Sequence, residues 1–274
     1  MKKAMYSADG HSTFSSNQVA TLRILFASLA LLPFGIRAFK ALDFRKDILS
    51  FSIVAICGNL APAFLFTYAE TGISSGLAGM LNSITPIFTI LIAIFIFKDK
   101  MNYRQFVGTA IGFIGVGLLL YFGKQNSIEG EWSHIISVLG ATLCYAISLS
   151  VIRYKLSHYK SLDIAAIAFL LLLLPSLVLF FTEDTLNTFQ NNIQIWNSLL
   201  AILILSIVGT ALALFIFNTI IKNTSALFAS SVTYFIPIVA VVFGFFFNEV
   251  ITALQITGML IALLGVFIAN SNRR

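Results

Sequence analysis

Apolar runs of membrane length alternate with short polar connections along nearly the whole chain. Each run is about 20 residues long, which is enough for a helix to cross ~30 Å of hydrocarbon. The alternating pattern of a β-barrel strand is absent, and a helix is the other structure that satisfies every backbone polar group in lipid. The runs predict nine transmembrane helices, at residues 19–39, 48–69, 76–97, 105–122, 134–152, 162–182, 196–221, 225–247 and 252–270.

The composition agrees with a protein whose surface lies mostly in lipid. Of the 274 residues, 58% are hydrophobic and 10% are charged, whereas a typical soluble domain carries about 25% charged residues. The predicted fold class is therefore an all-α polytopic membrane protein, with the lipid bilayer as its surrounding partner. Cys57 and Cys144 fall inside apolar runs without a metal-ligand spacing and are interpreted as small core residues.

The positions of the charges predict the orientation of the chain. With the basic loop 37–46 in the cytoplasm and later loops alternating, thirteen of the 17 Lys and Arg residues fall inside. The acidic stretches 129–131 and 183–184 fall outside. This positive-inside pattern predicts an inner or plasma membrane protein with a cytoplasmic C-terminus. The net charge of +6 sits in short clusters at helix ends and forms no continuous basic face, so no nucleic-acid partner is expected.

One stretch of the chain occurs twice. Residues 80–99 form an apolar run with an internal proline and a terminal carboxylate, and residues 230–249 repeat that plan. Corresponding residues are 151 positions apart at the proline and 150 apart from the carboxylate onward. We therefore predict two repeats, at residues 1–124 and 133–274. The matching pairs are Pro86 with Pro237, Asp99 with Glu249, Gln105 with Gln255, Gly108 with Gly258, Ile111 with Ile261 and Gly115 with Gly265.

The two repeats differ in length. There are 104 positions from Ser133 to Pro237 but only 85 from Met1 to Pro86, a difference of about one membrane helix. A helix equivalent to residues 134–152 is thus expected before Met1. Either the chain begins at an internal methionine or it is a natural nine-helix variant. With that helix restored, each repeat has five helices, and an odd number makes the two repeats insert with opposite orientation.

The repeated element resembles a known transporter family. It reads TPIFTILIAIFIFKDKMNYRQFVGTAIGFIGVG in the first half and IPIVAVVFGFFFNEVITALQITGMLIALLGV in the second. This pattern is similar to the EamA-type members of the drug/metabolite transporter superfamily, and NQVATLRILFASLALLPF resembles that family's second helix, with Arg23 at its arginine position. The resemblance implies two five-helix repeats, a first helix that forms a wall of the central cavity, and efflux of small organic compounds.

Two prolines mark a candidate cavity. A proline inside a helix leaves the carbonyl four residues earlier without its usual donor, here on Asn82 and Thr233. Weakened backbone at mid-membrane is tolerated where protein covers it or where it lines a cavity. Pro86 and Pro237 are interpreted as paired hinges at a substrate site, the alternative being kinks for close packing. The candidate substrate-binding residues, whose presence interhelical hydrogen bonding would also explain, are Asn59, Asn82, Tyr145, Asn218, Thr233 and Tyr234.

Arg23 and Glu70 are charged residues near outer helix ends. Arg23 joins the substrate-binding candidates as a fixed positive charge that meets an anionic or zwitterionic substrate, or pairs with Glu70; the alternative is that it snorkels toward the headgroups. None of the 11 carboxylates lies at the centre of a run, so Glu70 is the candidate for ion coupling. Asp99 and Glu249 are interpreted as anchors at helix ends.

The leading functional hypothesis is a secondary transporter that exports small organic metabolites, such as amino acids, by alternating access of the two repeats. No catalytic triad, metal-ligand cluster or phosphate-binding loop is evident, so neither enzymatic activity nor a cofactor is expected. The rival hypotheses are an inactive or regulatory membrane fragment and an intramembrane enzyme. The glycine-rich helices 105–122 and 252–270 predict close packing, either within one molecule or in a homodimer.

Overall fold

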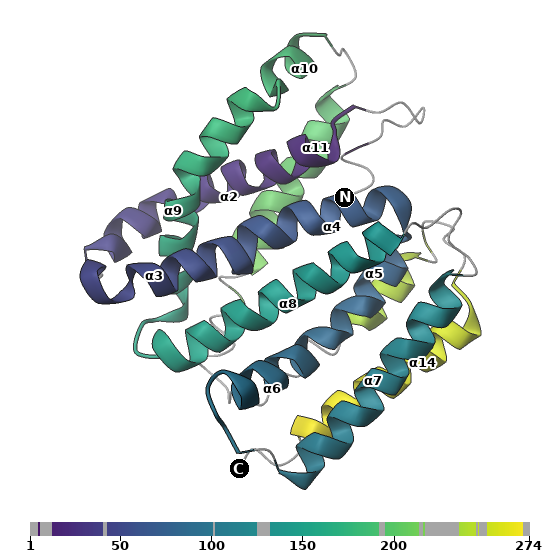
Figure 1. The fold of residues 1–274 in the computed structure, drawn as a ribbon. Coiled ribbons are helices and arrows are strands. Elements are labelled where there is room, and N and C mark those ends of the chain that lie inside the picture. The colour runs from purple at the N-terminus through teal and green to yellow at the C-terminus, as the bar shows by residue number, and fades with distance from the viewer. Residues whose placement is uncertain are drawn as a thin grey trace. The chain divides into compact units, whose positions relative to one another are not determined.

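The computed structural model describes residues 5, 13–40, 43–100, 102–124, 132–191, 195–213, 216, 236–244, 246 and 251–270. In these residues the regular structure is helical and contains no strand (Figure 1). Seven helices are long and apolar enough to cross a membrane, and Ala253–Ala269 is a shorter apolar helix. The prediction of an all-α, multi-pass membrane protein is therefore confirmed. The seven spans are Ser16–Phe39, Lys46–Gly72, Ser75–Phe95, Tyr103–Tyr121, Trp132–Lys155, Ser161–Thr182 and Ile195–Leu212.

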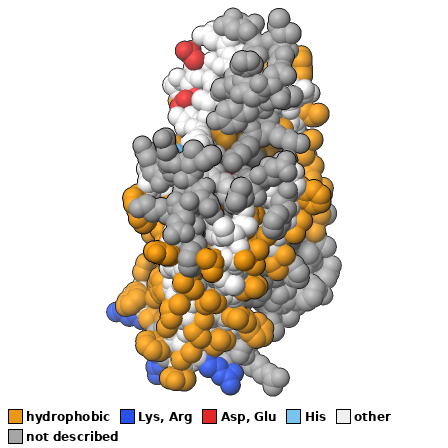
Figure 2. Space-filling model, turned by 90° about the vertical axis from the view of Figure 1, so that its right-hand side faces the viewer, with side chains coloured by type: hydrophobic (Ala, Val, Ile, Leu, Met, Phe, Trp, Pro, Cys, Tyr) orange, Lys and Arg blue, Asp and Glu red, His pale blue; other side chains and the backbone are white. Residues whose placement is uncertain are grey.

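The surface of these helices carries many large apolar side chains, unlike the surface of a typical soluble protein. Phe95 is 76% exposed and Phe246 is 78% exposed. Figure 2 shows apolar side chains spread over the face that it presents. Burial in lipid removes such side chains from water, so their exposure agrees with a chain that spans the bilayer.

Most helices begin and end within a few residues of the predicted bounds. They are α2 (Ser16–Phe39), α7 (Tyr103–Lys124), α8 (Trp132–Lys155), α9 (Ser161–Thr182) and α14 (Ala253–Asn270). A short helix that the sequence did not predict, α10 (Thr185–Asn191), follows α9. The predicted helix 225–247 is described only over residues 236–244 and 246, so the count of nine stays a prediction.

Three of the membrane spans change their helical type along their length. The second span consists of α3 (Phe44–Ala55), the π-helical turn η1 (Ile56–Leu60) and α4 (Ala61–Gly72). The third consists of α5 (Ser75–Leu81), the 3₁₀ turn η2 (Asn82–Ile84) and α6 (Thr85–Phe95). The seventh consists of α11 (Ile195–Ser206) and the π-helical turn η3 (Ile207–Leu212).

The helices form two compact units, and each unit takes segments from both predicted repeats. The first unit combines Met1–Thr71 with Val151–Asn223, and the second combines Gly72–Ser150 with Thr224–Arg274. This division differs from the predicted one at residues 1–124 and 133–274, because packing groups helices that are far apart in the sequence. The two repeats themselves stay a prediction.

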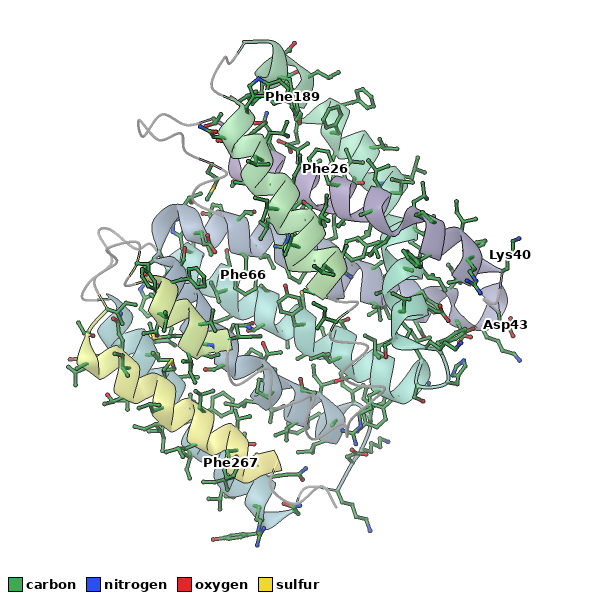
Figure 3. The ribbon with its side chains drawn as sticks, turned by 180° about the vertical axis from the view of Figure 1, so that it is seen from behind. Phe26, Lys40, Asp43, Phe66, Phe189 and Phe267 are labelled. Carbon is green, nitrogen blue, oxygen red and sulfur yellow. The ribbon has the colours of Figure 1, made fainter. Side chains whose placement is uncertain are left out.

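The first unit is built around α2 and α9, which pack side by side in opposite directions. Near one end of the pair, the Gln18 side chain contacts Glu183. Near the other end, a Cβ added to Gly35 would lie 2.9 Å from the carbonyl oxygen of Ala166. A second cluster joins α2 to α11 through Leu22 and Ile202, and Phe26 and Phe189 pack against it (Figure 3).

Gln18 anchors the start of α2. Its Oε1 accepts from the Ser15 backbone N–H at 3.0 Å, and the Ser15 hydroxyl accepts from the Gln18 N–H at 3.1 Å, which forms a capping box. Its Nε2 donates to the Glu183 carbonyl and to the Thr188 hydroxyl, each at 2.9 Å. One buried side chain therefore ties α2 to the segment that joins α9 and α10.

In the second unit, α7 and α14 pack backbone against backbone. A Cβ on Gly108 would lie 2.5 Å from both the Ala269 nitrogen and the Gly265 carbonyl oxygen, and one on Gly115 would lie 2.3 Å from the Ala262 nitrogen. Because the residue numbers rise along α7 as they fall along α14, the two helices are antiparallel. The glycine faces are thus occupied within one molecule, and a homodimer through these helices would have to use their other faces.

Candidate functional site

The second membrane span contains a π-helical turn with a polar side chain. In η1 the Ala61 N–H donates to the Ile56 carbonyl, five residues earlier. The Asn59 Nδ2 donates to the Val54 carbonyl at 3.3 Å. Pro62 follows the turn and has no N–H for the Gly58 carbonyl. The wider turn therefore lies just before a proline, and the Asn59 amide adds a side-chain bond to the backbone of the same helix.

The seventh span contains a second turn of the same type. In η3 the Ala213 N–H donates to the Val208 carbonyl, again five residues earlier. The Thr210 hydroxyl donates to the Leu205 carbonyl at 3.3 Å. Asn59 and Thr210 are both half-buried. Each turn therefore combines an irregular backbone with one polar side chain, and π-turns of this kind frequently lie at functional sites.

The two π-turns stand 151 positions apart, which is the spacing of Pro86 and Pro237 in the sequence repeat. The same spacing relates Asn59 to Thr210 and the carbonyl acceptors Val54 and Leu205. Thr210 was missed in the sequence, although ICGN at Ile56 and IVGT at Ile207 carry the signal. The structure thus shows one polar side chain in each of two π-turns that have the spacing of the sequence repeat.

Both turns lie against α2. Leu60 of η1 packs on a core cluster that includes Ala20 and Ile24, and Ala211 of η3 packs on the cluster of Ala27, Leu31 and Phe169. Asn59 stands near the middle of the second span, in a turn that contacts α2. The turn η3 contacts the same helix. The first unit brings the two equivalent turns to one helix.

Arg23 lies on this same helix. It follows Ala20 by three positions and precedes Ala27 by four. Residues three or four apart are neighbours on a helix surface, so Arg23 lies beside both alanines on α2. Its side chain is half-buried. Glu70 also belongs to the first unit; it is half-buried at the end of α4, with its Oε2 atom shielded from solvent. A pair between Arg23 and Glu70 stays a prediction, as does the coupling role of Glu70.

Asn82 belongs to the second unit, in the turn before Pro86. The Thr85 backbone N–H donates to the Asn82 carbonyl, and the Thr85 hydroxyl donates to the Asn82 Oδ1 at 3.2 Å. The carbonyl that the proline frees is therefore taken up by a tighter 3₁₀ turn. The Asn82 side chain remains half-buried beside Pro86, which begins α6 together with Thr85.

The other predicted site residues are distributed as follows. Tyr145 is half-buried on α8, and Pro237 is buried in the helical segment 236–244; both belong to the second unit. Asn218, Thr233 and Tyr234 lie outside the described residues. No group of three or more His, Cys, Asp or Glu residues in the described part of the chain could hold a metal ion.

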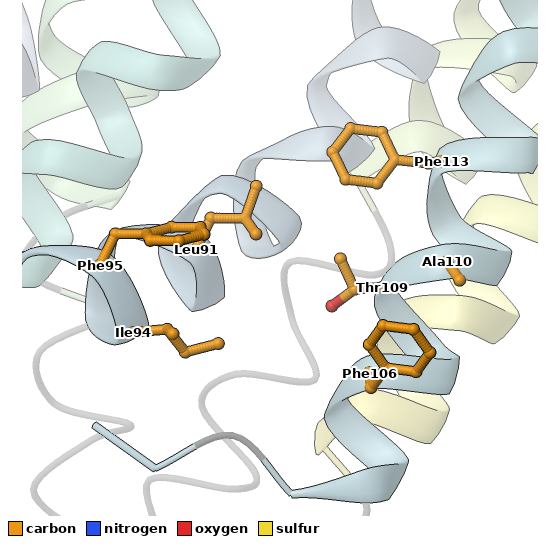
Figure 4. Close-up of a pocket in the computed structure, with 7 residues that line it drawn as sticks. All are labelled: Leu91, Ile94, Phe95, Phe106, Thr109, Ala110 and Phe113. Carbon is orange, nitrogen blue, oxygen red and sulfur yellow. The ribbon is translucent and has the colours of Figure 1, made fainter. Parts of the chain in front are cut away.

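An apolar groove lies between α6 and α7 (Figure 4). Its volume is about 320 Å³. Thr109 is its single polar lining residue, and no hydrogen-bond partner for the buried Thr109 hydroxyl is found among the described residues. A groove of this chemistry suits hydrocarbon and offers no partners to a polar solute. The lining residues are Leu91, Ile94, Phe95, Phe106, Thr109, Ala110 and Phe113.

A polar cluster joins the start of α3, where Figure 3 labels Asp43, to the turn after α8. The Tyr159 hydroxyl donates to the Asp47 carboxylate at 2.8 Å and accepts from the Asp43 N–H at 3.3 Å. Burial raises the pKa of Tyr159 above its ordinary value of 10.0, and its bond to Asp47 raises it further. His158 lies 3.7 Å from the same carboxylate. The cluster holds two connecting segments of the first unit together.

Membrane spans that contain a polar, irregular turn, as the second and seventh spans do, are used by secondary transporters at their substrate sites. The EamA-like transporter family matches residues 4–121 and 132–271. The chain belongs to this family, as its resemblance implied.

Two bacterial relatives match this chain over most of their length. The chain is 24% identical to a "Probable terminal-alkyne amino-acid exporter" of Streptantibioticus cattleyicolor, over 90% of this chain and 82% of that protein. It is 26% identical to a "Probable amino-acid metabolite efflux pump" of Salmonella typhimurium, over 88% and 84%. A crystal structure with 14% identity matches with a TM-score of 0.59, covering 94% of this chain and 89% of that one, and shows the fold alone.

Proposed function

We propose that the chain is a secondary transporter that exports small organic metabolites, with amino acids and related compounds as the substrate class. One observation carries this proposal: two family members that match over more than four-fifths of both chains bear the names of an amino-acid exporter and an amino-acid metabolite efflux pump. The described part of the chain adds apolar spans interrupted by polar turns, an arrangement that suits a small polar solute.

Transport proceeds by alternating access of two inverted repeats. The contacts between α7 and α14 support this mechanism. Gly108 contacts Gly265, and a shift of 150 positions turns this pair into Gly258 and Gly115, which also meet. Moving each residue to its counterpart in the other repeat thus converts one contact between the two antiparallel helices into another. A two-fold axis between equivalent helices produces contacts of this kind. The repeats then rock about such axes, and the site opens to one side at a time.

The substrate site is formed by the polar positions inside the membrane spans. Arg23 faces the acidic group of the substrate, Glu70 takes part in ion coupling, and Pro86 and Pro237 are hinges. The half-buried Asn59 and Asn82 sit at the irregular turns η1 and η2, which supports their place in this site. The remaining candidates are Tyr145, Asn218, Thr233 and Tyr234.

The chain resides in an inner or plasma membrane with its C-terminus in the cytoplasm, as the excess of basic residues in alternate loops supports. A reporter pair fused after Arg274 tests this orientation. Alkaline phosphatase is expected to stay inactive there, while a green fluorescent protein is expected to fluoresce. Active phosphatase would reverse the assigned orientation.

Counterflow in proteoliposomes tests the function. Purified protein is reconstituted into vesicles loaded with one unlabelled compound, and uptake of the same labelled compound is followed for the standard amino acids, nucleosides and cationic drugs. Uptake above that of protein-free vesicles is expected for at least one amino acid. The variant Arg23→Gln is expected to reduce it at least tenfold, because the substrate carboxylate loses its positive partner. No counterflow with any compound class would overturn the proposal.

A further inference from the structure

We infer that the two π-turns hold the ammonium group of the transported solute, with Asn59 and Thr210 as the paired contact residues of the two halves. This inference rests on the proposed function, since it names the chemical group that the same site recognises. It assigns a role to Thr210, which no motif in the sequence singled out, and it predicts that the solute must be an amine.

The coincidence of the two turns argues against accidental distortion. π-Turns are rare, yet these two stand 151 positions apart, and each places a hydrogen-bonding side chain at its fourth residue. Both side chains bond the carbonyl five residues earlier, at 3.3 Å. A glycine, Gly58 or Gly209, precedes each of them, and glycine weakens a helix interior. Irregular backbone persists in a membrane where protein covers it or where it lines a cavity.

The groups at the turns are mainly acceptors. One Asn59 amide N–H and the Thr210 hydroxyl proton are already used in the bonds to the Val54 and Leu205 carbonyls, so the Asn59 Oδ1 and the Thr210 oxygen remain as acceptors. Neither Ile56–Leu60 nor Ile207–Leu212 contains a charged residue. An ammonium group carries three donors and no acceptor, so it can bond these oxygens while both side chains keep their bonds to the helix backbone. A carboxylate needs donors, and it would find only the second Asn59 amide N–H unless those bonds broke.

The position of the turns on α2 fits a zwitterion. Both turns contact α2; Leu60 packs against a cluster that includes Ala20, and Ala211 packs against one that includes Ala27. Arg23 stands between these two alanines along the helix. An amino acid with its ammonium group at a π-turn therefore has a cationic partner for its carboxylate on the helix that both turns contact. The absence of a fixed negative charge in the turns keeps binding weak enough for release.

Transport of an amine and of its hydroxy analogue tests the inference. The probes are the standard amino acid with the largest counterflow and the α-hydroxy acid with the same side chain. Asn59→Leu and Thr210→Val are each expected to reduce amine counterflow at least tenfold and to abolish its advantage over the hydroxy acid. Asn59→Gln and Thr210→Ser retain a neutral acceptor oxygen and are expected to stay within about threefold of the wild type.

The matched control is Thr67→Val. The Thr67 hydroxyl donates to the Ala63 carbonyl at 2.8 Å, in a regular part of α4. Its removal thus deletes a side-chain bond to the helix backbone without touching a π-turn. Counterflow within twofold of the wild type is expected. Size-exclusion profiles in detergent identify any variant that fails to fold, in which case the labelling of Cys57, with Asn59 and Thr210 in place, decides on the inference.

Thiol labelling tests solute binding without transport. Cys57 lies in the first turn, and Val208 is its counterpart 151 positions later. In a Cys144→Ala background, a water-soluble maleimide is expected to label Cys57, and in a Cys57→Ala, Cys144→Ala background it is expected to label the variant Val208→Cys. The amino acid is expected to slow both reactions at least threefold, and the hydroxy acid is expected to leave them unchanged. Cys144 in a Cys57→Ala background is expected to show no protection.

The outcomes separate the two proposals. If the wild type gives no counterflow, the proposed function fails, and protection of Cys57, measured with each standard amino acid in turn, still decides on the ammonium site. If the wild type transports but Asn59→Leu and Thr210→Val behave like Thr67→Val, the inference is overturned and the proposed function stands. Equal counterflow of amine and hydroxy acid, or labelling that neither compound slows, also overturns it.

Discussion

Gly108 on α7 and Gly265 on α14 meet with no room for a side chain on either. A Cβ on Gly108 would lie 2.5 Å from the Gly265 carbonyl oxygen, and a Cβ on Gly265 would lie 2.5 Å from the Gly108 carbonyl oxygen. Real Cβ atoms do not approach a backbone atom so closely. The pair therefore fixes how near α7 and α14 approach each other, as small residues do between membrane helices.

Replacement of Gly108 by alanine is expected to destabilise the protein by about 1–3 kcal/mol, because the added methyl group forces the two backbones apart. The comparison is Gly117→Ala on the same helix, where an added Cβ meets nothing within 4 Å. That control is expected to be neutral or slightly stabilising, since alanine favours a helix. Thermal unfolding in detergent measures both. A Gly108→Ala protein as stable as Gly117→Ala would contradict the close approach.

Replacement of Gln18 by leucine is expected to lower the stability by about 1–3 kcal/mol, because the partly buried bonds of its side chain to the Ser15 N–H, the Glu183 carbonyl and the Thr188 hydroxyl are all lost. Asn17→Ala is the control. Asn17 is exposed and makes a single bond, of 3.3 Å, to the Glu183 carboxylate, so its loss is expected to change stability by less than about 0.5 kcal/mol. Equal effects of the two substitutions in thermal unfolding would contradict the anchoring role of Gln18.

Replacement of Tyr159 by phenylalanine is expected to change how stability depends on pH. Because the folded protein raises the pKa of Tyr159, the contribution of its neutral hydroxyl is present below pH 10.0 and is lost as the pH rises through the folded-state pKa. The wild type is thus expected to exceed Tyr159→Phe in stability by about 1 kcal/mol at pH 8, and by less at pH 11.

Unfolding followed between pH 7 and pH 11 measures this difference. Tyr103→Phe is the control, since Tyr103 is 81% exposed, and its effect is expected to be small at every pH. A gap between the wild type and Tyr159→Phe that widened above pH 10 would reverse the sign of the argument and exclude this origin.

Replacement of Thr109 by valine is expected to stabilise the protein by about 0.5–2 kcal/mol. The side chain is 6% exposed, and its hydroxyl has no hydrogen-bond partner among the described residues. Valine has the same shape and fills the apolar groove between α6 and α7 without an unsatisfied polar atom. Thr89→Val is the control, because the Thr89 hydroxyl donates to the Thr85 carbonyl at 2.9 Å. A loss of stability in Thr109→Val would indicate that the hydroxyl has a partner.

Much of the site could be predicted from the sequence only as a set of polar positions. Asn59 and Asn82 were identified because an amide inside an apolar run is unusual, and both stand at a change of helical type. The partner of Asn59 was not identified. Thr210 looks ordinary in the sequence, since threonine commonly bonds its own helix, and its meaning depends on the second π-turn.

The sequence by itself determined the class of protein, the bounds of most helices and the family. These follow from local properties: the bilayer thickness fixes the length of an apolar run, and the helix is the backbone form that such a run can adopt in lipid. The resemblance in the repeated element, which includes Pro86 and Gly108, was equally readable because it needs no contact between distant residues.

Only the tertiary structure decided which helices pack together and where their backbone changes type. Whether Gly108 and Gly265 meet within one molecule depends on residues far apart in the chain, and both glycine faces were equally suited to a dimer. The α-helical and π-helical forms of the backbone at Asn59 and Thr210 differ little in energy. Contacts with neighbouring helices such as α2 decide which form is adopted. The sequence pattern therefore predicts helix length and position, while contacts between distant helices determine their packing and the type of their irregular turns.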